Sequence, residues 1–156
     1  MNNKEILKET AVKVNALLTE YVEVHDKILK DAASFSSLFK HVNFKELYDD
    51  TITIHSKFYY KKEVISNMKD TMYDYLTRIE KEFFNCLSDY VDALIKTTEI
   101  LSAQMKLLYD RSENKIKLSY KEYITVNKQY QESVGEYLKI GGRLNDLYSK
   151  LYNSGE

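Results

Sequence analysis

The chain has 156 residues, a length that fits one domain spanning 1–156. It contains no Pro and only four Gly, against average usage of about 5% and 7%, so turns are few and long helices are favoured. Its 23 basic and 24 acidic residues give a net charge of −1, which excludes the basic footprint of a general nucleic-acid binder. A hydrophobic fraction of 44% argues against disorder.

The chain shows no targeting or membrane signal. Residues 1–5 carry no apolar stretch of the secretory type. No uncharged apolar run approaches the roughly 18 residues that a transmembrane helix needs. The single cysteine, Cys86, excludes an internal disulfide and fits a reducing compartment. We therefore expect a cytoplasmic protein.

The first expected element is a helix over about 3–41. Apolar residues follow a strict seven-residue repeat through this segment, which is typical of a coiled-coil-like helix. Asn2 and Glu5 have the spacing of a capping box at its start. The repeat consists of Leu7, Val14, Tyr21, Ile28, Phe35 and Val42, with Ala11, Leu18, His25, Ala32 and Phe39 as the second series.

A short helix near 43–50 comes next. Asn43 and Glu46 have capping-box spacing at its start. Residues 49–55 combine β-branched alternation with poor helix propensity. The sequence therefore predicts the first chain reversal there.

The second long helix is expected over about 56–109. Its apolar residues recur every eleven positions, as in Met68, Ile79, Tyr90 and Leu101. This period is close to the pitch of a straight helix, and the helix would be about 80 Å long at 1.5 Å per residue.

The third long helix is expected over about 112–153, where seven-residue spacing returns. Asp110 and Glu113 have capping-box spacing, which places the second reversal at 109–112. No Gly or Pro marks this turn, so one uninterrupted helix over 56–153 is the alternative. Gly141 and Gly142 lie inside the third helix, where they indicate a close helix approach or a bend.

All three helices carry apolar residues outside the main repeats, which a two-stranded coiled coil would not need. We therefore expect an elongated antiparallel bundle, all-α, in which each helix touches two neighbours. A homodimer would cover what remains exposed, and the 14 tyrosines suit half-buried or contact positions. The residues outside the repeats are Val12, Leu17, Val22, Leu29, Val64, Phe84, Val91, Ile95, Ile124, Leu138 and Leu147.

Two polar residues occupy core positions. His25 lies in the first repeat, and counting along the helices places it near the level of Cys86, so a nucleophile–base or metal-ligand pair is one hypothesis. A hydrogen-bonded core histidine and an inert buried thiol is the preferred interpretation. Asn127 lies in the third helix, where a buried asparagine fixes register or oligomeric state.

The sequence carries no recognised catalytic, cofactor or metal motif. Val22, Leu38 and Ile52 stand three residues before the three histidines, so the Glu-x-x-His motif of di-metal bundles is absent. Phosphate loops, zinc spacings and nucleophile elbows are absent as well. We therefore predict neither enzymatic activity nor a cofactor.

Basic residues surround the expected second turn. The segment 106–121 contains five basic residues and only two acidic ones, Asp110 and Glu113. A second basic set, Lys57, Lys61 and Lys62, lies at the other end of the second helix. Such tips could contact anionic lipid head groups or be ordinary solvated loop charge. The turn cations are Lys106, Arg111, Lys115, Lys117 and Lys121.

The stretch from Leu87 to Arg111, followed by Lys115 to Tyr123, resembles the second-helix end, basic tip and third-helix start of BAR domains of the sorting-nexin kind. The resemblance covers about 40 residues and is one of pattern. It implies a crescent-shaped dimer that binds curved anionic membranes, with Lys106, Arg111, Lys115 and Lys117 at its tips.

The favoured function is therefore a non-enzymatic helical interaction protein: an adaptor, a chaperone or a self-associating scaffold. It would bind a protein partner, itself, or both through apolar and tyrosine-rich helix faces. A BAR-like membrane-surface dimer is the first alternative. A small secreted or viral helical protein is the second, although the absence of Trp removes the Trp-x-Gly turn of the known secreted hairpins.

Overall fold

A computed structural model describes residues 1–32 and 42–153 of the chain. These residues form four α-helices: α1 (Asn3–Ala32), α2 (Phe44–Met72), α3 (Arg78–Ser112) and α4 (Tyr120–Tyr152). A short 3-10 helix, η2 (Tyr73–Tyr75), follows α2. The expected all-α bundle is confirmed.

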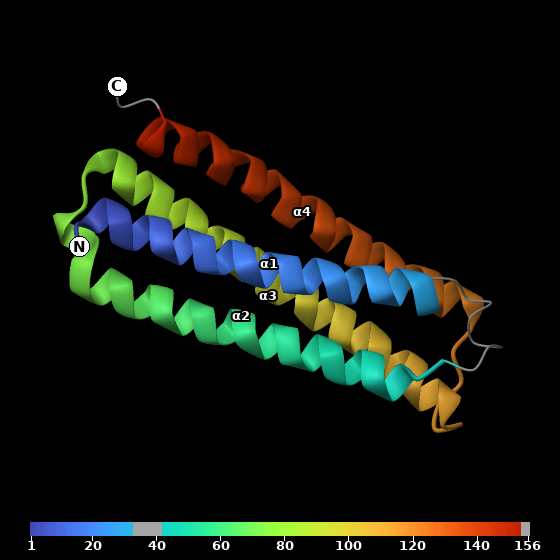
Figure 1. The fold of residues 1–156 in the computed structure, drawn as a ribbon. Helices are drawn as coiled ribbons and strands as arrows, with labels where there is room; N and C mark the ends of the chain where they lie inside the picture. Colours follow the sequence, from blue (N-terminus) through green and yellow to red (C-terminus); the bar gives the residue numbers. More distant parts are fainter. Residues whose placement is uncertain (33–41, 154–156) are drawn as a thin grey trace.

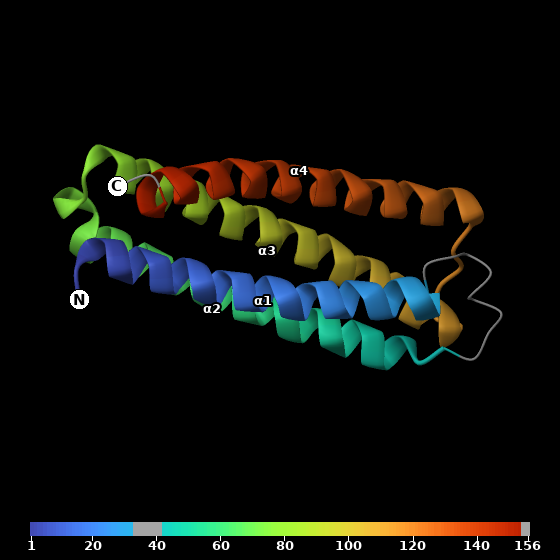
Figure 2. The same cartoon turned by 45° about the horizontal axis from the view of Figure 1, so that its top comes forward.

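The helices run alternately up and down, so that each is antiparallel to the next along the chain (Figure 1). In Figure 1, α1 lies between α2 and α4 and in front of α3, and in the turned view of Figure 2 it lies in front of α2. α1 and α4 are therefore neighbours in the bundle, although no loop connects one directly to the other.

The start of α1 agrees with the sequence. The side chain of Asn2 accepts a hydrogen bond from the amide of Glu5, whose carboxylate accepts one from the amide of Asn2, both at 2.9 Å. The first seven-residue series is buried as predicted, from Leu7 at 0% exposed to Ile28 at 6%. The rest of the expected helix over 3–41, from residue 33 onward, lies outside the described residues.

The expected short helix near 43–50 and the reversal after it are wrong. Asn43 does cap a helix, but that helix is α2, which runs on to Met72. The stretch judged a poor helix former contributes Thr51 and Ile54 to the interior, both at most 2% exposed. Burial of this apolar face outweighs the weak intrinsic preference of β-branched residues.

The expected unbroken helix over 56–109 is also wrong. The chain reverses at 73–77, between α2 and α3. Thr77 caps α3 in a complete capping box with Glu80, and the buried Leu76 is extended (ψ 145°). The eleven-residue repeat passes over this break because Leu76, within the turn, and Ile79, in the first turn of α3, both still pack against the core.

The next reversal lies at 113–119, later than the expected 109–112, and it excludes the continuous helix over 56–153. Asp110 belongs to the last turn of α3, where it pairs with Lys106 at 3.0 Å. The capping box of α4 is formed by Ser119 and Glu122. Asn114 turns the chain in the left-handed region at φ 58°, a conformation that asparagine tolerates.

Candidate functional site

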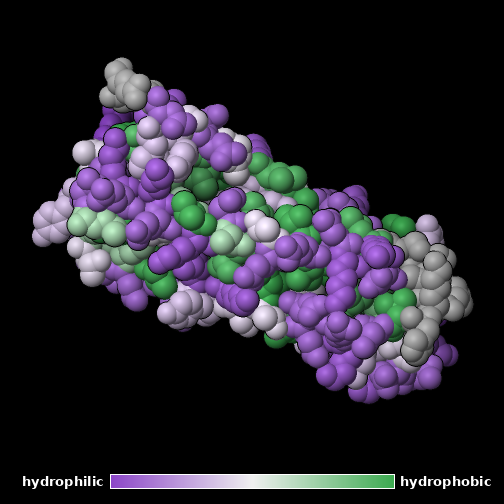
Figure 3. All heavy atoms as spheres, in the orientation of Figure 1, coloured by the Kyte–Doolittle hydropathy of each residue, from purple (hydrophilic) through white to green (hydrophobic). Residues whose placement is uncertain are grey.

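An elongated groove separates α1 from α4. It has a volume of about 570 Å³ and is lined by Ala11, Asn15 and Leu18 on one side and by Leu138, Gly142 and Asn145 on the other. Figure 3 shows hydrophobic side chains gathered along the same boundary. Volumes of about 300–1,000 Å³ are typical of binding sites.

Tyrosine side chains bridge α1 and α4 at both ends of this groove. At one end the hydroxyl of Tyr152 donates to the carbonyl of Lys4 at 2.6 Å. At the other end the hydroxyls of Tyr21 and Tyr130 are hydrogen-bonded to each other. Between these bridges the groove lining combines the small residues Ala11, Gly141 and Gly142 with larger ones such as Leu18 and Leu138.

Gly141 sets the depth of the groove. A Cβ atom at this position would lie 3.2 Å from Cε2 of Tyr90, whereas one at Gly142 would meet no atom within 4 Å. Tyr90 and Phe83 line the groove from α3. Of the two expectations for this pair, close approach is the one observed at Gly141, and α4 continues through both glycines.

Five aliphatic side chains remain exposed along the two helices. Of the eleven apolar residues that lie outside the main repeats, Leu17, Val64, Ile95 and Leu147 are half-buried, and Phe84 and Val91 are buried. The other five all belong to α1 or α4, and they are 39–59% exposed: Val12, Val22, Leu29, Ile124 and Leu138.

The cavities between α1 and α4 are lined by uncharged residues, and the ammonium groups of Lys4 and Lys8 lie over the ring of Tyr152 near one end of the groove. A second, smaller cavity of about 70 Å³ lies near His25, Leu29, Asn127 and Gln131. None of the described residues that line either cavity is Asp, Glu, Lys or Arg, although 30% of the chain is charged. We call this surface the α1/α4 face and define it by Val12, Asn15, Val22, Leu29, Ile124, Gln131, Leu138 and Asn145.

A cluster of aromatic residues fills the space beside the groove. Nδ1 of His25 lies 2.6 Å from the hydroxyl of Tyr130, and the two rings stack with centroids 5.6 Å apart. Tyr137 packs edge-on against Tyr21 at 5.8 Å and beside Tyr90 at 6.3 Å. Burial raises the pKa of Tyr21 and Tyr130 far above the ordinary value and that of Tyr90 to about 12. These hydroxyls therefore stay protonated and act as hydrogen-bonding packing groups.

His25 and Cys86 do not come together. His25 shares its cavity with Leu101 and Met105 of α3, whereas the thiol of Cys86 is buried and donates to the carbonyl of Ile140 at 3.8 Å. The expected level was wrong because the break at 73–77 makes α3 run parallel to α1. Leu101 and Met105 of α3, and not Cys86, are then level with His25.

Asn127 lies half-buried in α4, where its Oδ1 accepts a hydrogen bond from Nε2 of Gln104 at 3.4 Å. This contact joins α3 to α4 and lies close to the His25 cavity. A role in fixing the register of these two helices stays a prediction.

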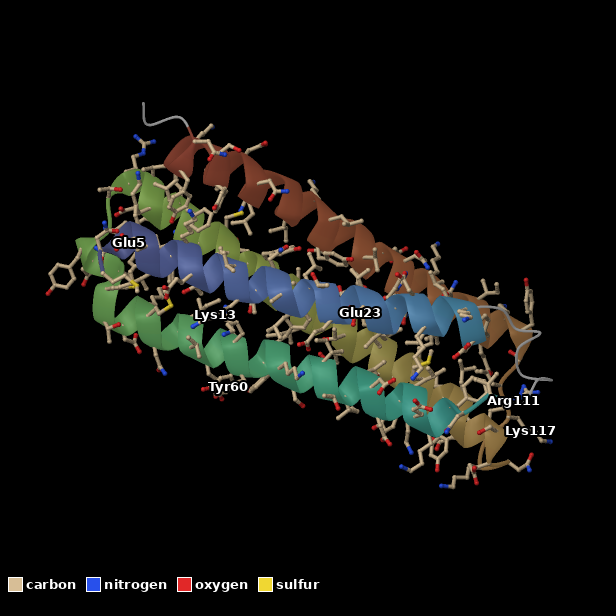
Figure 4. The ribbon with its side chains drawn as sticks, viewed as in Figure 1. Glu5, Lys13, Glu23, Tyr60, Arg111 and Lys117 are labelled. Atoms are coloured by element: carbon tan, nitrogen blue, oxygen red, sulfur yellow. The ribbon has the colours of Figure 1, made fainter. Side chains whose placement is uncertain are left out.

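The basic residues of the second turn gather at one end of the bundle, where Figure 4 shows Arg111 and Lys117. Lys106 is paired with Asp110 and lies 5.7 Å from the ring centroid of Tyr48. Arg111 donates to the carbonyl of Leu118 at 2.6 Å. Both side chains therefore help to hold the turn.

The other cations of this turn lie further out. Lys115 stands 5.8 Å from the ring centroid of Tyr109. Lys117 and Lys121 border a shallow depression of about 420 Å³ that includes Ile116 and Leu118. This depression combines exposed basic groups with apolar surface.

The second basic set does not lie at an end of the bundle. The helix that carries it, α2, begins at Phe44 instead of near residue 56, so Lys57, Lys61 and Lys62 lie in its interior. Lys57 pairs with Glu20 and Lys62 with Asp92, both at 2.9 Å. Burial, together with Lys13, lowers the pKa of Lys61. Figure 4 shows Lys13 and Tyr60 beside the space between α1 and α2.

Comparison with known proteins gives no relative. No family model matches the chain, and neither a curated protein nor a solved structure does. Within the described residues no three His, Cys, Asp or Glu side chains are placed to hold a metal ion together. No described helix has the length and apolar character needed to cross a bilayer. The fold defines the class, an antiparallel four-helix bundle, and its most distinctive surface is the α1/α4 face.

Proposed function

We propose that the protein is a non-enzymatic interaction module that binds protein through the α1/α4 face. The observation that carries this proposal is a groove of about 570 Å³ without charged lining residues. Exposed aliphatic side chains flank it, with Val12 at 56% and Leu138 at 59%. Depletion of charge and enrichment of apolar area are typical of the buried centre of protein interfaces.

The positions of the reactive side chains support an interaction role over catalysis. Nδ1 of His55 lies 3.0 Å from the hydroxyl of Thr98, and His25 is engaged by Tyr130. Cys86 is 1% exposed, so its thiol offers no accessible nucleophile. None of these groups faces the groove between Ala11 and Gly142.

A photo-crosslinking experiment tests the proposal. The photoreactive residue p-benzoyl-phenylalanine replaces Leu138 in one variant and Tyr59, which is 57% exposed on α2, in a matched control. Both purified variants are irradiated alone and in extract of the cells that express the chain. We expect adducts with protein from position 138 that position 59 does not give. If position 138 yields no protein adduct, of a second copy or of any other protein, the proposal fails.

Binding of anionic membranes by the α3–α4 turn is the second candidate, and the BAR-like resemblance points to the same residues. Its supporting observation is the depression bordered by Lys117 and Lys121, beside which Ile116 is 36% and Tyr120 61% exposed. Basic residues near such a surface contribute about 1 kcal/mol each.

Co-sedimentation with phosphatidylserine vesicles tests this second candidate. We expect binding at low salt that weakens at high salt, and that Lys117→Glu combined with Lys121→Glu abolishes. Leu138→Glu serves as the matched control, because it lies on the α1/α4 face and leaves the turn intact. Absence of binding at low salt would remove the membrane candidate.

A further inference from the structure

We propose that the occupant of the α1/α4 face is a second copy of this chain, in a two-fold dimer whose axis lies perpendicular to the bundle. This inference rests on the proposed function, because it names the partner of the same face. In such a dimer α1 packs antiparallel on α1 of the other copy, and α4 packs antiparallel on α4. The area, the charge distribution and the register of the face each support this arrangement.

The area of the face is sufficient for a stable dimer. α1 has 30 and α4 has 33 residues, so each helix is about 45–50 Å long at 1.5 Å per residue, and two adjacent helices are about 20 Å wide. The face therefore covers about 1,000 Å². Stable interfaces bury about 800 Å² on each partner.

One seven-residue series of α4 on the face carries no charge, although Lys128, Lys139 and Asp146 stand within one helical turn of its members. The series Ile124, Gln131, Leu138 and Asn145 is uncharged, whereas the series Glu136, Arg143 and Lys150 occupies the opposite flank. Arg143 lies 3.6 Å from Asp89 of α3, which confirms the direction of that flank.

The charges of α1 follow the same rule. Glu20 and Lys27, on the flank toward α2, pair with Lys57 and Asp50. The positions toward α4 are Lys8, Asn15, Val22 and Leu29, and Lys8 lies over the ring of Tyr152 at one end of the series. Beyond Lys8, both helices turn an uncharged series toward the same side.

The strip on α1 is complementary to itself when it is reversed. With the two-fold axis near residue 17, residues equally far from the axis meet across the interface, so Val12 meets Val22. Lys8 likewise meets Asp26. Both are exposed. Lys8 contacts the ring of Tyr152 at 5.8 Å, whereas Asp26 makes no ion pair with the described residues.

The strip on α4 is complementary about the same level. Leu18 and Leu138 line one groove, so the middle of α1 is level with the middle of α4. An axis through Leu138 places this side chain against its own copy, and Gln131 then meets Asn145. Two uncharged amides can satisfy each other at an interface.

Size-exclusion chromatography with light scattering, on the full chain, tests the dimer. We expect twice the chain mass for the unmodified protein and for Tyr59→Glu, and the single mass for Leu138→Glu with an unchanged helical circular dichroism spectrum. Lys8→Asp and Asp26→Lys should each raise the dissociation constant about tenfold. The double variant should restore it, because the two charges exchange places.

The register is tested by crosslinking. Leu138→Cys should join to its own copy with a short bismaleimide, whereas Tyr59→Cys and the unmodified chain, whose only thiol is the buried Cys86, should not. A monomer at every concentration, a dimer that Leu138→Glu leaves intact, or no rescue by the double charge exchange overturns the inference. If position 138 photo-crosslinks only to other proteins while the chain stays monomeric, this inference fails and the proposed function stands.

Discussion

The two adjacent glycines of α4 allow a matched test of the groove geometry. Replacement of Gly by Ala inside a helix stabilises it by about 1 kcal/mol when the new methyl group finds space. At Gly142 the Cβ meets no atom within 4 Å. We therefore expect Gly142→Ala to raise the free energy of unfolding by about 1 kcal/mol.

At Gly141 the same gain meets a steric cost. The added Cβ would lie 3.2 Å from Cε2 and 3.5 Å from Cζ of Tyr90. Tyr90 is only 8% exposed and its ring packs against Tyr137, so it has little room to move. Overpacking of this kind costs about 1–3 kcal/mol. Gly141→Ala should therefore be less stable than Gly142→Ala by about that amount.

Urea and thermal unfolding followed by circular dichroism measure the difference. For a chain of this size 1 kcal/mol shifts the midpoint temperature by about 2–4 °C. The slope of the free energy against urea should be the same in both variants, because neither changes the surface exposed on unfolding. Equal stabilisation by both substitutions would show that the ring of Tyr90 is not held against Gly141, and would refute the reasoning.

Three further outcomes are expected. Tyr130→Phe removes the hydroxyl that Tyr21 and His25 share and should lower the free energy of unfolding by about 1–3 kcal/mol; Tyr59→Phe, measured the same way, should change it by less than about 0.5 kcal/mol. Tyr90 keeps its proton to about pH 12 when folded but only to about pH 10 when unfolded. The folded state therefore binds more protons in this range, and its stability should be full below about pH 10 and fall as the pH rises to about 12. Tyr90 alone should contribute about 2–3 kcal/mol to this fall, in addition to Tyr21 and Tyr130, whose pKa values are also raised; a flat profile in urea titrations across this range would contradict the burial of these rings. Ser119→Ala removes the side-chain cap of α4 and should lower stability by about 1 kcal/mol, with an unchanged urea midpoint arguing against that cap.

Two of the three chain reversals illustrate how local signals can be overlooked. Thr77 with Glu80 and Ser119 with Glu122 both have capping-box spacing in the sequence, and both form complete boxes in the structure. The first was hidden by an apolar repeat that continues across the break. The second was missed because Asp110, in the last turn of α3, offered a similar spacing nine residues earlier.

The candidate site was visible only in part. The apolar residues outside the repeats, and the glycine pair Gly141 and Gly142, could be singled out from their positions alone. Their exposure could not be predicted, because other apolar residues outside the repeats, such as Phe84 and Val91, are only 1% and 0% exposed. Whether a side chain outside the repeat faces a neighbouring helix or solvent depends on which helices become neighbours.

The sequence by itself determined that this chain is helical, that the series from Leu7 to Ile28 would be buried and that α1 begins with an Asn2–Glu5 cap. These features depend on interactions within one helix turn or on the periodicity of a single segment. Only the tertiary structure decided the number of helices, the partners of His25 and Cys86, and the groove between α1 and α4. Those depend on where the chain reverses, because one additional reversal at 73–77 turns α3 parallel to α1 and changes every contact between residues distant in the sequence.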